Sequence, residues 1–266
     1  MDREQSYIRV SELELRREQA IEKCGETLVL KAESCLQSLL KEAEIFIRLD
    51  ADNLERVLRD GRFKSIFEIK VESTIVDTEE LMDVRIIERR LAEEKLFGYS
   101  QDLPPALRPI YGYVASSVNA MECGDVIPYY GEIGIKLKQP LKNRTTFTGD
   151  DSLFRPQSYR ESFEKMTRQP SMFEAANIAS FVSWEDIAGN AENLRWRLET
   201  IASSTSLADL MEAKEQHFYF EAQIHAGVTI EDIDEIIYIE DIPSDSIAQL
   251  ALERGIAISV VNLNES

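Results

Sequence analysis

The sequence predicts an α+β fold, and three observations point to that class. Residues 11–58 carry a helical periodicity, residues 110–148 contain short strand-like segments, and the C-terminal part is again rich in β-prone residues. The strands surround a mostly helical stretch over residues 157–203, as expected of an α+β domain. We therefore expect an N-terminal helical subdomain over residues 1–60 and an α+β domain over residues 61–266.

The N-terminal part has the pattern of amphipathic helices. Apolar residues recur every three or four positions from Leu28 to Phe46 and form one stripe. Gly25 is expected to divide the run into two helices, and Asp60-Gly61 to end it. A helix with one apolar stripe buries it against a neighbour, so we expect this part to pack on the following domain.

The middle of the chain alternates between helical and strand-like patterns. Residues 67–73 alternate in part and predict a strand, whereas residues 78–97 have a charged helical pattern. Prolines at positions 104, 105 and 109 require an extended segment, which leads into a strand over residues 110–115. Residues 130–138 and 145–148 predict two further strands. In the first of these, Ile133, Ile135 and Leu137 share one face, and Pro140 ends the segment.

The C-terminal third combines helices with strands. Ser183 and Asp186 form a capping box before an amphipathic helical run within residues 171–203. Residues 204–216 predict a polar loop with one helical turn. Beyond the loop, strands are predicted over residues 217–225, 236–239 and 257–261, and a short helix over residues 246–254, ended by Gly255.

Charge and composition exclude several classes of function. The chain of 266 residues has 30 basic and 49 acidic residues and a formal net charge of −19. This field repels a phosphate backbone, so nucleic acid is not an expected partner. It attracts a protein with a basic face, although the acidity also serves solubility. No stretch approaches the ~20 apolar residues that a membrane span needs, and the charged N-terminus is no conventional secretory signal peptide.

Cysteines and histidines are too few for most metal sites. Cys24, Cys35 and Cys123 are scattered, which argues against a disulfide framework or a Cys-x-x-Cys zinc site and favours three reduced thiols. The histidines are His217 and His225, so a His-rich metal site is excluded, while an all-carboxylate site is not. We expect His225 to be a hydrogen-bonded structural histidine rather than a base.

Three short blocks contain residues suited to chemistry. The first, over residues 107–113, reads LRPIYGY and places Arg108 at the mouth of a strand. The second, over residues 144–152, reads RTTFTGDDS and puts two threonines on one face of a strand. The third, over residues 219–227, reads YFEAQIHAG and puts Glu221 on one strand face together with the glutamine and histidine that follow it.

The order of an arginine, a Thr-x-Thr pair and a strand-borne glutamate resembles the arginine–serine–glutamate class of mono-ADP-ribosyltransferase toxins. The three blocks are also similar to a bacterial domain family that carries Arg-Pro-x-Tyr-Gly, Arg-x-Thr-Phe-Thr-x-Gly-Asp-Ser and Glu-Ala-Gln-x-His-Gly. That neighbourhood includes type III secreted effectors that ADP-ribosylate host ubiquitin on a threonine and so block ubiquitination. The resemblance spans about residues 61–262.

The resemblance implies a fold, a co-substrate and roles for individual residues. The fold would be an ADP-ribosyltransferase-like split β-sheet core, and the co-substrate NAD. Glu221 would be the catalytic carboxylate, stabilising the positive charge that develops on the ribose as nicotinamide leaves. Arg108 would bind the pyrophosphate bidentately. The cofactor site would also include Tyr111, and Thr146 and Thr148 would brace Glu221 and line the nicotinamide pocket.

Two assignments within the resemblance stay open. Arg62 and Arg144 compete with Arg108 for the pyrophosphate. Arg144 begins the second block, and Arg62 lies in a further block that is similar to the same bacterial domain family, GRFKS over residues 61–65, which could supply a second cation or merely close a helix. Tyr219 stands where many such toxins carry a Glu or Gln that helps choose the target residue. An arginine target is therefore in doubt, whereas a hydroxyl target such as a threonine is compatible with Tyr219.

The resemblance also implies a place of action and an acceptor. The protein would be a bacterial effector, secreted without a conventional signal peptide and active in the host cytosol, with ubiquitin as the candidate acceptor. Two other functions remain possible from the sequence. One is a catalytically inactive binding module of the same fold. The other is a glycoside-type hydrolase that uses Glu221 together with a second carboxylate.

Overall fold

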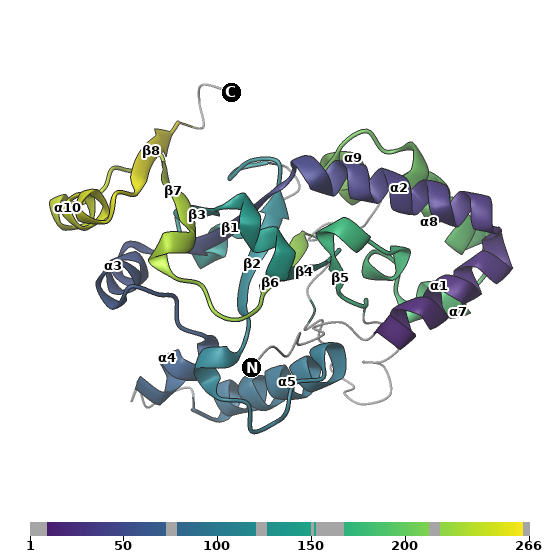
Figure 1. Ribbon diagram of the computed structural model, residues 1–266, viewed down its shortest axis with the longest axis horizontal. Coiled ribbons are helices and arrows are strands. Elements are labelled where there is room, and N and C mark those ends of the chain that lie inside the picture. Colours follow the sequence, from purple (N-terminus) through teal and green to yellow (C-terminus); the bar gives the residue numbers. More distant parts are fainter. Residues whose placement is uncertain are drawn as a thin grey trace.

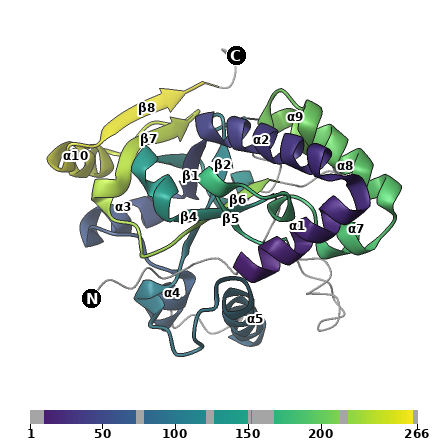
Figure 2. The same ribbon diagram turned by 45° about the vertical axis from the view of Figure 1, so that its right-hand side comes forward.

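An eight-stranded sheet forms the centre of the computed structural model, which describes residues 10–72, 79–120, 127–149, 152, 168–212 and 219–262 (Figures 1 and 2). The strand order is β5-β4-β6-β2-β1-β3-β7-β8, and every pair is antiparallel except β7 with β8. The strands are β1 (Glu44–Leu49), β2 (Ile110–Ala115), β3 (Ile133–Leu137), β4 (Thr145–Thr148), β5 (Ser171–Met172), β6 (Phe220–Ile224), β7 (Ile233–Ile239) and β8 (Ala257–Val261).

Helices pack around this sheet, so the predicted α+β class is confirmed. The α-helices are α1 (Val10–Cys24), α2 (Glu26–Glu42), α3 (Ala51–Asp60), α4 (Ile66–Glu72), α5 (Glu79–Phe97), α7 (Trp184–Ala188), α8 (Ala191–Ser203), α9 (Leu207–Glu212) and α10 (Asp245–Arg254). Figures 1 and 2 both show α1, α2, α7 and α8 grouped on one side of the molecule and α4 with α5 on another. Among the described helices, none has the length and apolar character that crossing a bilayer requires.

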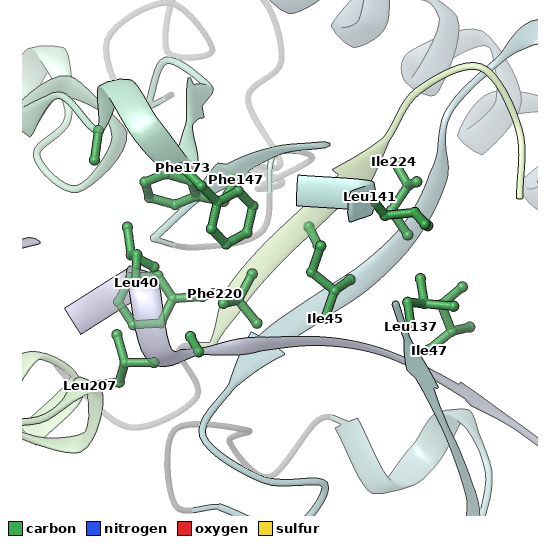
Figure 3. Close-up of a cluster of buried hydrophobic side chains, with 14 of the residues drawn as sticks. Leu40, Ile45, Ile47, Leu137, Leu141, Phe147, Phe173, Leu207, Phe220 and Ile224 are labelled. Carbon is green, nitrogen blue, oxygen red and sulfur yellow. The ribbon is translucent and has the colours of Figure 1, made fainter. Parts of the chain in front are cut away.

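The two faces of the sheet have different characters, because successive strand residues point to opposite sides. One face packs Phe147, Phe220 and Ile45 against Leu40 of α2 in the main hydrophobic core (Figure 3). The opposite face carries a smaller apolar cluster that includes Phe46. On that face, β4, β6 and β2 also present a row of buried polar side chains: Thr146, Thr148, Glu221, Gln223 and the half-buried Tyr111.

The largest difference from the sequence prediction concerns residues 44–49. The helical stripe was expected to continue to Phe46, but α2 ends at Glu42 and the next residues form β1 in the middle of the sheet. The four central residues of β1 are buried, so the run is almost continuously apolar, and periodicity alone cannot distinguish such a run from a buried helix. Residues 1–60 therefore supply a central strand and do not form a purely helical subdomain.

Most other elements agree with their patterns. The strands predicted at residues 110–115 and 145–148 and the strand after residue 256 are confirmed, as are the helix that ends at Gly255 and the capping box of Ser183 with Asp186. Gly61 ends α3 in the left-handed conformation, as expected from Asp60-Gly61. The helix predicted over residues 157–168 lies, apart from its last residue, outside the described residues.

Two local predictions were wrong. Residues 67–73 were predicted as a strand, but Ile66–Glu72 form α4, whose Glu68 side chain accepts the backbone N–H of Ser65 and stabilises the first turn. Residues 171–183 were predicted as mostly helical, but they form the short strand β5 and two 3₁₀ turns. Asn177 caps the second of these turns by accepting the N–H of Ala179, a local bond that competes with a continuous helix.

The sheet opens along one of its central pairs. β1 and β2 are paired only at Glu44 with Ala115, Ile45 with Val114 and Phe46 with Tyr113. Beyond these pairs, the last residues of β1 pair with β3 alone, and the first residues of β2 pair with β6 alone. The eight strands thus form one hydrogen-bonded sheet that parts along half of the β1–β2 pair.

Gly112 occupies the point where β1 and β2 separate. A Cβ atom at this position would lie 2.3 Å from the backbone carbonyl oxygen of Phe46, which is far closer than a side chain tolerates. Glycine is therefore required there for the backbones to approach.

Candidate functional site

A pocket of about 310 Å³ lies where β1 and β2 part. Its volume is at the lower end of the range of small-molecule sites. Its lining comes from the end of β1, the start of β2, the segment that enters α4, α4 itself, α5, β6 and the 3₁₀ turn Ile127–Tyr130. Glu221 of β6 and Tyr219, just before that strand, are part of the lining, so the pocket contains the carboxylate that the sequence singled out.

Glu221 is buried and firmly held. Only 3% of it is exposed, so it does not face solvent. Its Oε1 atom accepts hydrogen bonds from the Ser152 hydroxyl, from the Ser152 backbone N–H at 3.3 Å and from Gln223 Nε2 at 2.9 Å. The Tyr219 hydroxyl lies 3.5 Å from Oε2. These donors fix the carboxylate in one orientation within the pocket.

Thr146 and Thr148 do not line the pocket, and both are hydrogen-bonded to Gln223. Thr146 Oγ1 donates to Gln223 Oε1 at 2.8 Å, and Gln223 Nε2 donates to Thr148 Oγ1 at 3.1 Å. Together they set the orientation of the Gln223 amide, which in turn holds Glu221. The expected bracing role therefore fits both threonines, acting through Gln223, whereas the expected lining role does not, because neither threonine is among the residues that line the pocket.

His225 extends this network into the interior, and the prediction of a structural histidine is confirmed. Its ring is fully buried, with Nε2 at 3.0 Å from Thr146 Oγ1 and Nδ1 at 2.6 Å from the Tyr99 hydroxyl. Because Thr146 donates its proton to Gln223, it must accept from His225, which assigns the proton to Nε2. Burial, together with the nearby charge of Arg144, lowers the pKa of His225 to about 3, so the ring is neutral.

His225 is expected to make the fold acid-sensitive. Its folded-state pKa lies below the ordinary value of 6.5, so the unfolded chain binds the proton first and stability falls as the pH drops from 6.5 towards 3. Between pH 7 and pH 5 the wild type should lose about 2 kcal/mol more of its unfolding free energy than His225→Gln. Urea unfolding of both proteins at the two pH values measures this difference. The carboxylates are the same in both proteins, so their contribution to the pH dependence cancels. Equal losses would contradict the assignment.

Arg108 is a structural residue in this arrangement. It is 1% exposed, and its Nη1 atom lies 2.6 Å from a carboxylate oxygen of Glu93, which is itself fully buried. Nη2 donates to the carbonyls of Ser100 and Gln101, and the guanidinium lies 4.6 Å from the centre of the Phe67 ring. Arg108 does not line the pocket. The expected pyrophosphate role does not fit this position, because the cation ties the segment before β2 to α5.

The two competing arginines also lie outside the pocket lining. Arg62 forms an ion pair of 2.6 Å with Glu68 and stays beside the start of α4. Arg144 pairs with Asp232 at 3.0 Å and donates to the carbonyls of two residues that follow β6. The expected cofactor contact of Arg62 therefore does not fit the structure either, since its side chain serves to close the α3–α4 connection.

Tyr111, which the resemblance assigns to the cofactor site, lines the pocket. Its hydroxyl donates to Glu93 at 3.0 Å, and the guanidinium carbon of Arg89 lies 3.9 Å from the ring centre. Burial and the charge of Glu93 raise the pKa of Tyr111 well above its ordinary value, so the hydroxyl remains a donor. The ring is thus fixed between α5 and the pocket.

Three cations line the pocket: Arg48 of β1, Lys64 and Arg89 of α5. Sequence reasoning missed Arg48 and Arg89, and in the block over residues 61–65 it named Arg62 rather than Lys64. Lys64 pairs with Asp60 at 2.9 Å. The signal for Arg48 was an arginine inside the apolar run EIFIRL, which on a strand shares a face with Phe46. Because residues 44–49 were predicted as part of a helix, this signal was not recognised.

Arg48 is the most informative of the three cations. It is 9% exposed and donates to the Tyr113 hydroxyl, to the carbonyls of Val118 and Gly131 and to the side-chain oxygen of Asn119. Within the part of the chain that the structure describes, no carboxylate pairs with it. A buried guanidinium held only by neutral groups has no opposite charge beside it, so at the pocket wall it would favour an anionic ligand.

The described lining of the pocket contains fewer carboxylates than cations. Among the described residues that line it, Glu221 is the single carboxylate. Among the described residues, no group of three or more His, Cys, Asp or Glu side chains is arranged to hold a metal ion. The arrangement can therefore stabilise a developing positive charge at one point and hold a negatively charged group at another.

The chain is similar in sequence to a phage protein. No protein-family model matches the chain. It is 25% identical over 225 residues to the Gene 2 protein of Mycobacterium phage L5, a match that covers 84% of this chain and 74% of the phage protein. The chain is thus similar over most of its length to a phage protein, at an identity that does not place it in a family.

Proposed function

We propose that the protein is an NAD-dependent ADP-ribosyltransferase that modifies a protein acceptor and has an ADP-ribosyltransferase-like core. One observation carries the proposal: the fixed, buried carboxylate of Glu221 lies in a pocket that three cations line, in a chain of net charge −19. NAD is a ligand that needs both features. Its pyrophosphate is anionic, and its ribose becomes positively charged when nicotinamide leaves.

The proposed reaction uses both the carboxylate of Glu221 and the cations of the pocket. The bond between nicotinamide and the ribose breaks, and nicotinamide leaves as a neutral molecule. Glu221 stabilises the resulting ribose cation electrostatically, as an oriented and largely desolvated carboxylate does best. The acceptor hydroxyl then forms the new carbon–oxygen bond and loses its proton to solvent. Because the cation is a strong electrophile, positioning supplies most of the rate and no strong base is required.

The structure suggests a different distribution of cofactor roles from the one that the resemblance implies. Arg48 takes the pyrophosphate role in the proposal, in place of Arg108 and Arg62, because it lines the pocket and has no described carboxylate partner. Tyr111 keeps a role in the pocket wall. Thr146 and Thr148 keep the bracing role only.

The two alternative functions are separable from this proposal. A glycoside-type hydrolase uses two carboxylates that flank the scissile bond, and Glu221 has no second carboxylate among the described pocket-lining residues. An inactive binding module would bind NAD without cleaving it. Equilibrium titration with NAD and with a set of sugars, combined with a nicotinamide-release assay, separates the three.

Arg48→Ala is expected to weaken NAD binding by about tenfold or more, because a charge-assisted contact to a pyrophosphate is lost from a desolvated site. Arg62→Ala is the matched control, since Arg62 lies outside the pocket lining and should change the Kd by less than about twofold. Calorimetric titration measures both. An unchanged Kd for Arg48→Ala, with the fold intact by circular dichroism, would remove Arg48 from the site.

Ubiquitin, modified on a threonine hydroxyl in the host cytosol so that ubiquitination is blocked, remains the candidate acceptor. The support is the resemblance of the three blocks, the net charge of −19 and Tyr219 at the position next but one before Glu221. Incubation of ubiquitin with NAD and the protein, followed by intact-mass measurement, should show one added ADP-ribose. Unmodified ubiquitin beside another labelled protein would keep the enzyme class and remove this acceptor.

A further inference from the structure

Exposed apolar side chains gather at the mouth of the pocket. Ile66 and Ile69 of α4 and Tyr130 of the 3₁₀ turn line the pocket and are also about half exposed. Beside them lie Leu107, on a 3₁₀ turn that contacts α4, and Tyr129, which is 87% exposed. We call these five residues the mouth patch. Single exposed apolar residues are ordinary on a protein surface, but a group around a pocket marks an interaction site.

The mouth patch is held in place by the surrounding backbone. Ser65 Oγ donates to the carbonyl of Pro105 at 2.8 Å and joins α4 to the turn that carries Leu107. On the other side of the mouth, Gly131 has a φ of 128°, and a Cβ there would lie 2.1 Å from the backbone of Leu49. This close approach holds the two tyrosines against the end of β1. The patch is therefore preformed, which reduces the entropy lost on binding.

The charges beside the two tyrosines indicate the kind of partner. Glu132 follows Gly131 directly and is exposed. Asp50, whose backbone lies against Gly131, is also exposed and caps α3. The tyrosine side of the patch is therefore bordered by acidic side chains, whereas Lys64 lines the pocket on the α4 side. The tyrosine side fits a protein surface on which an apolar side chain is bordered by basic ones.

We propose that the mouth patch docks the acceptor protein and presents its hydroxyl group to the NAD site. This inference rests on the proposed function, because it assigns the substrate-docking surface of the same pocket. The acceptor inserts an apolar side chain among the patch residues and places basic side chains near Asp50 and Glu132. The reaction with water as the acceptor does not use this surface. Docking and NAD cleavage are therefore separable by mutation.

The test uses Tyr129→Lys combined with Leu107→Lys. Both residues are exposed, and neither lines the pocket, so the fold and the NAD site should persist. Two rates are measured: nicotinamide release from NAD without a protein acceptor, and ADP-ribose incorporation from labelled NAD into lysate proteins. Leu252→Lys, on exposed α10 away from the pocket lining, is the matched control.

The double variant should keep nicotinamide release within about twofold of wild type and lose at least about tenfold in protein labelling, as when a central interface residue is replaced. The control should keep both rates. Labelling by the double variant at the wild-type rate overturns the docking proposal alone, as does an equal fall in both rates. A wild-type protein that is dimeric by sedimentation, with a monomeric double variant, also overturns it. A wild-type protein that cleaves no NAD overturns the proposed function as well.

Discussion

Glu221→Gln is expected to reduce ADP-ribose transfer by about a hundredfold to a thousandfold and to leave the protein folded. The amide keeps the shape and an acceptor oxygen for Ser152, but it removes the negative charge that faces the developing ribose cation. Losses of about 10²–10³ in rate are typical when one such electrostatic group is removed from a desolvated site. Single-turnover nicotinamide release measures the chemical step directly.

The choice of glutamine matters because Glu221 is buried. Alanine would leave the donors of Ser152 and Gln223 without their carboxylate and would cost about 1–3 kcal/mol of stability. Glu235→Gln, on β7 of the same sheet and outside the pocket lining, is the matched control and should retain wild-type rates. Unchanged transfer by Glu221→Gln would remove Glu221 from the catalytic role.

Arg108→Ala is expected to destabilise the fold by about 3–5 kcal/mol, because it leaves the carboxylate of Glu93 buried without its partner. Burial already raises the pKa of Glu93 despite the neighbouring arginine, which shows how strongly this carboxylate is desolvated. Removing the cation also releases the carbonyls of Ser100 and Gln101. Urea unfolding at pH 7 measures the loss.

A second variant separates structure from ligand binding at this site. Arg108→Met combined with Glu93→Gln removes both buried charges, keeps an acceptor for the Tyr111 hydroxyl and should recover much of the lost stability. Its NAD affinity should then remain within a few-fold of wild type, since neither residue lines the pocket. If Arg108→Ala were as stable as wild type and failed to bind NAD, the pyrophosphate role would return to Arg108.

The polar row of the site could be predicted from the sequence because it depends on local geometry. On a strand, residues two apart share a face, so the pairs of threonines on β4 and of Glu221 and Gln223 on β6 follow from spacing alone. Glycine and proline residues near these strands indicated where they end. The pairing of β4 with β6, which brings the two sets together, required the structure.

The sequence could not predict which arginine lines the pocket, for two physical reasons. Arg48 lies on a strand that is buried on both sides, and such apolar runs have no periodicity that separates them from helix. Arg108 has a conspicuous sequence position, but its partner Glu93 lies fifteen residues earlier on a helix, a contact that no local pattern reveals. The pocket itself arises where β1 and β2 part, which is a property of long-range strand pairing.

One measurement tests directly the central claim that Glu221 is the catalytic carboxylate in the transfer of ADP-ribose from NAD to a protein. The protein is incubated with NAD and with lysate proteins or ubiquitin, and the masses of the products are determined together with released nicotinamide. We predict that wild type releases nicotinamide and adds a single ADP-ribose to an acceptor, and that Glu221→Gln does neither at a comparable rate. NAD that remains intact with wild type under all these conditions would contradict the claim.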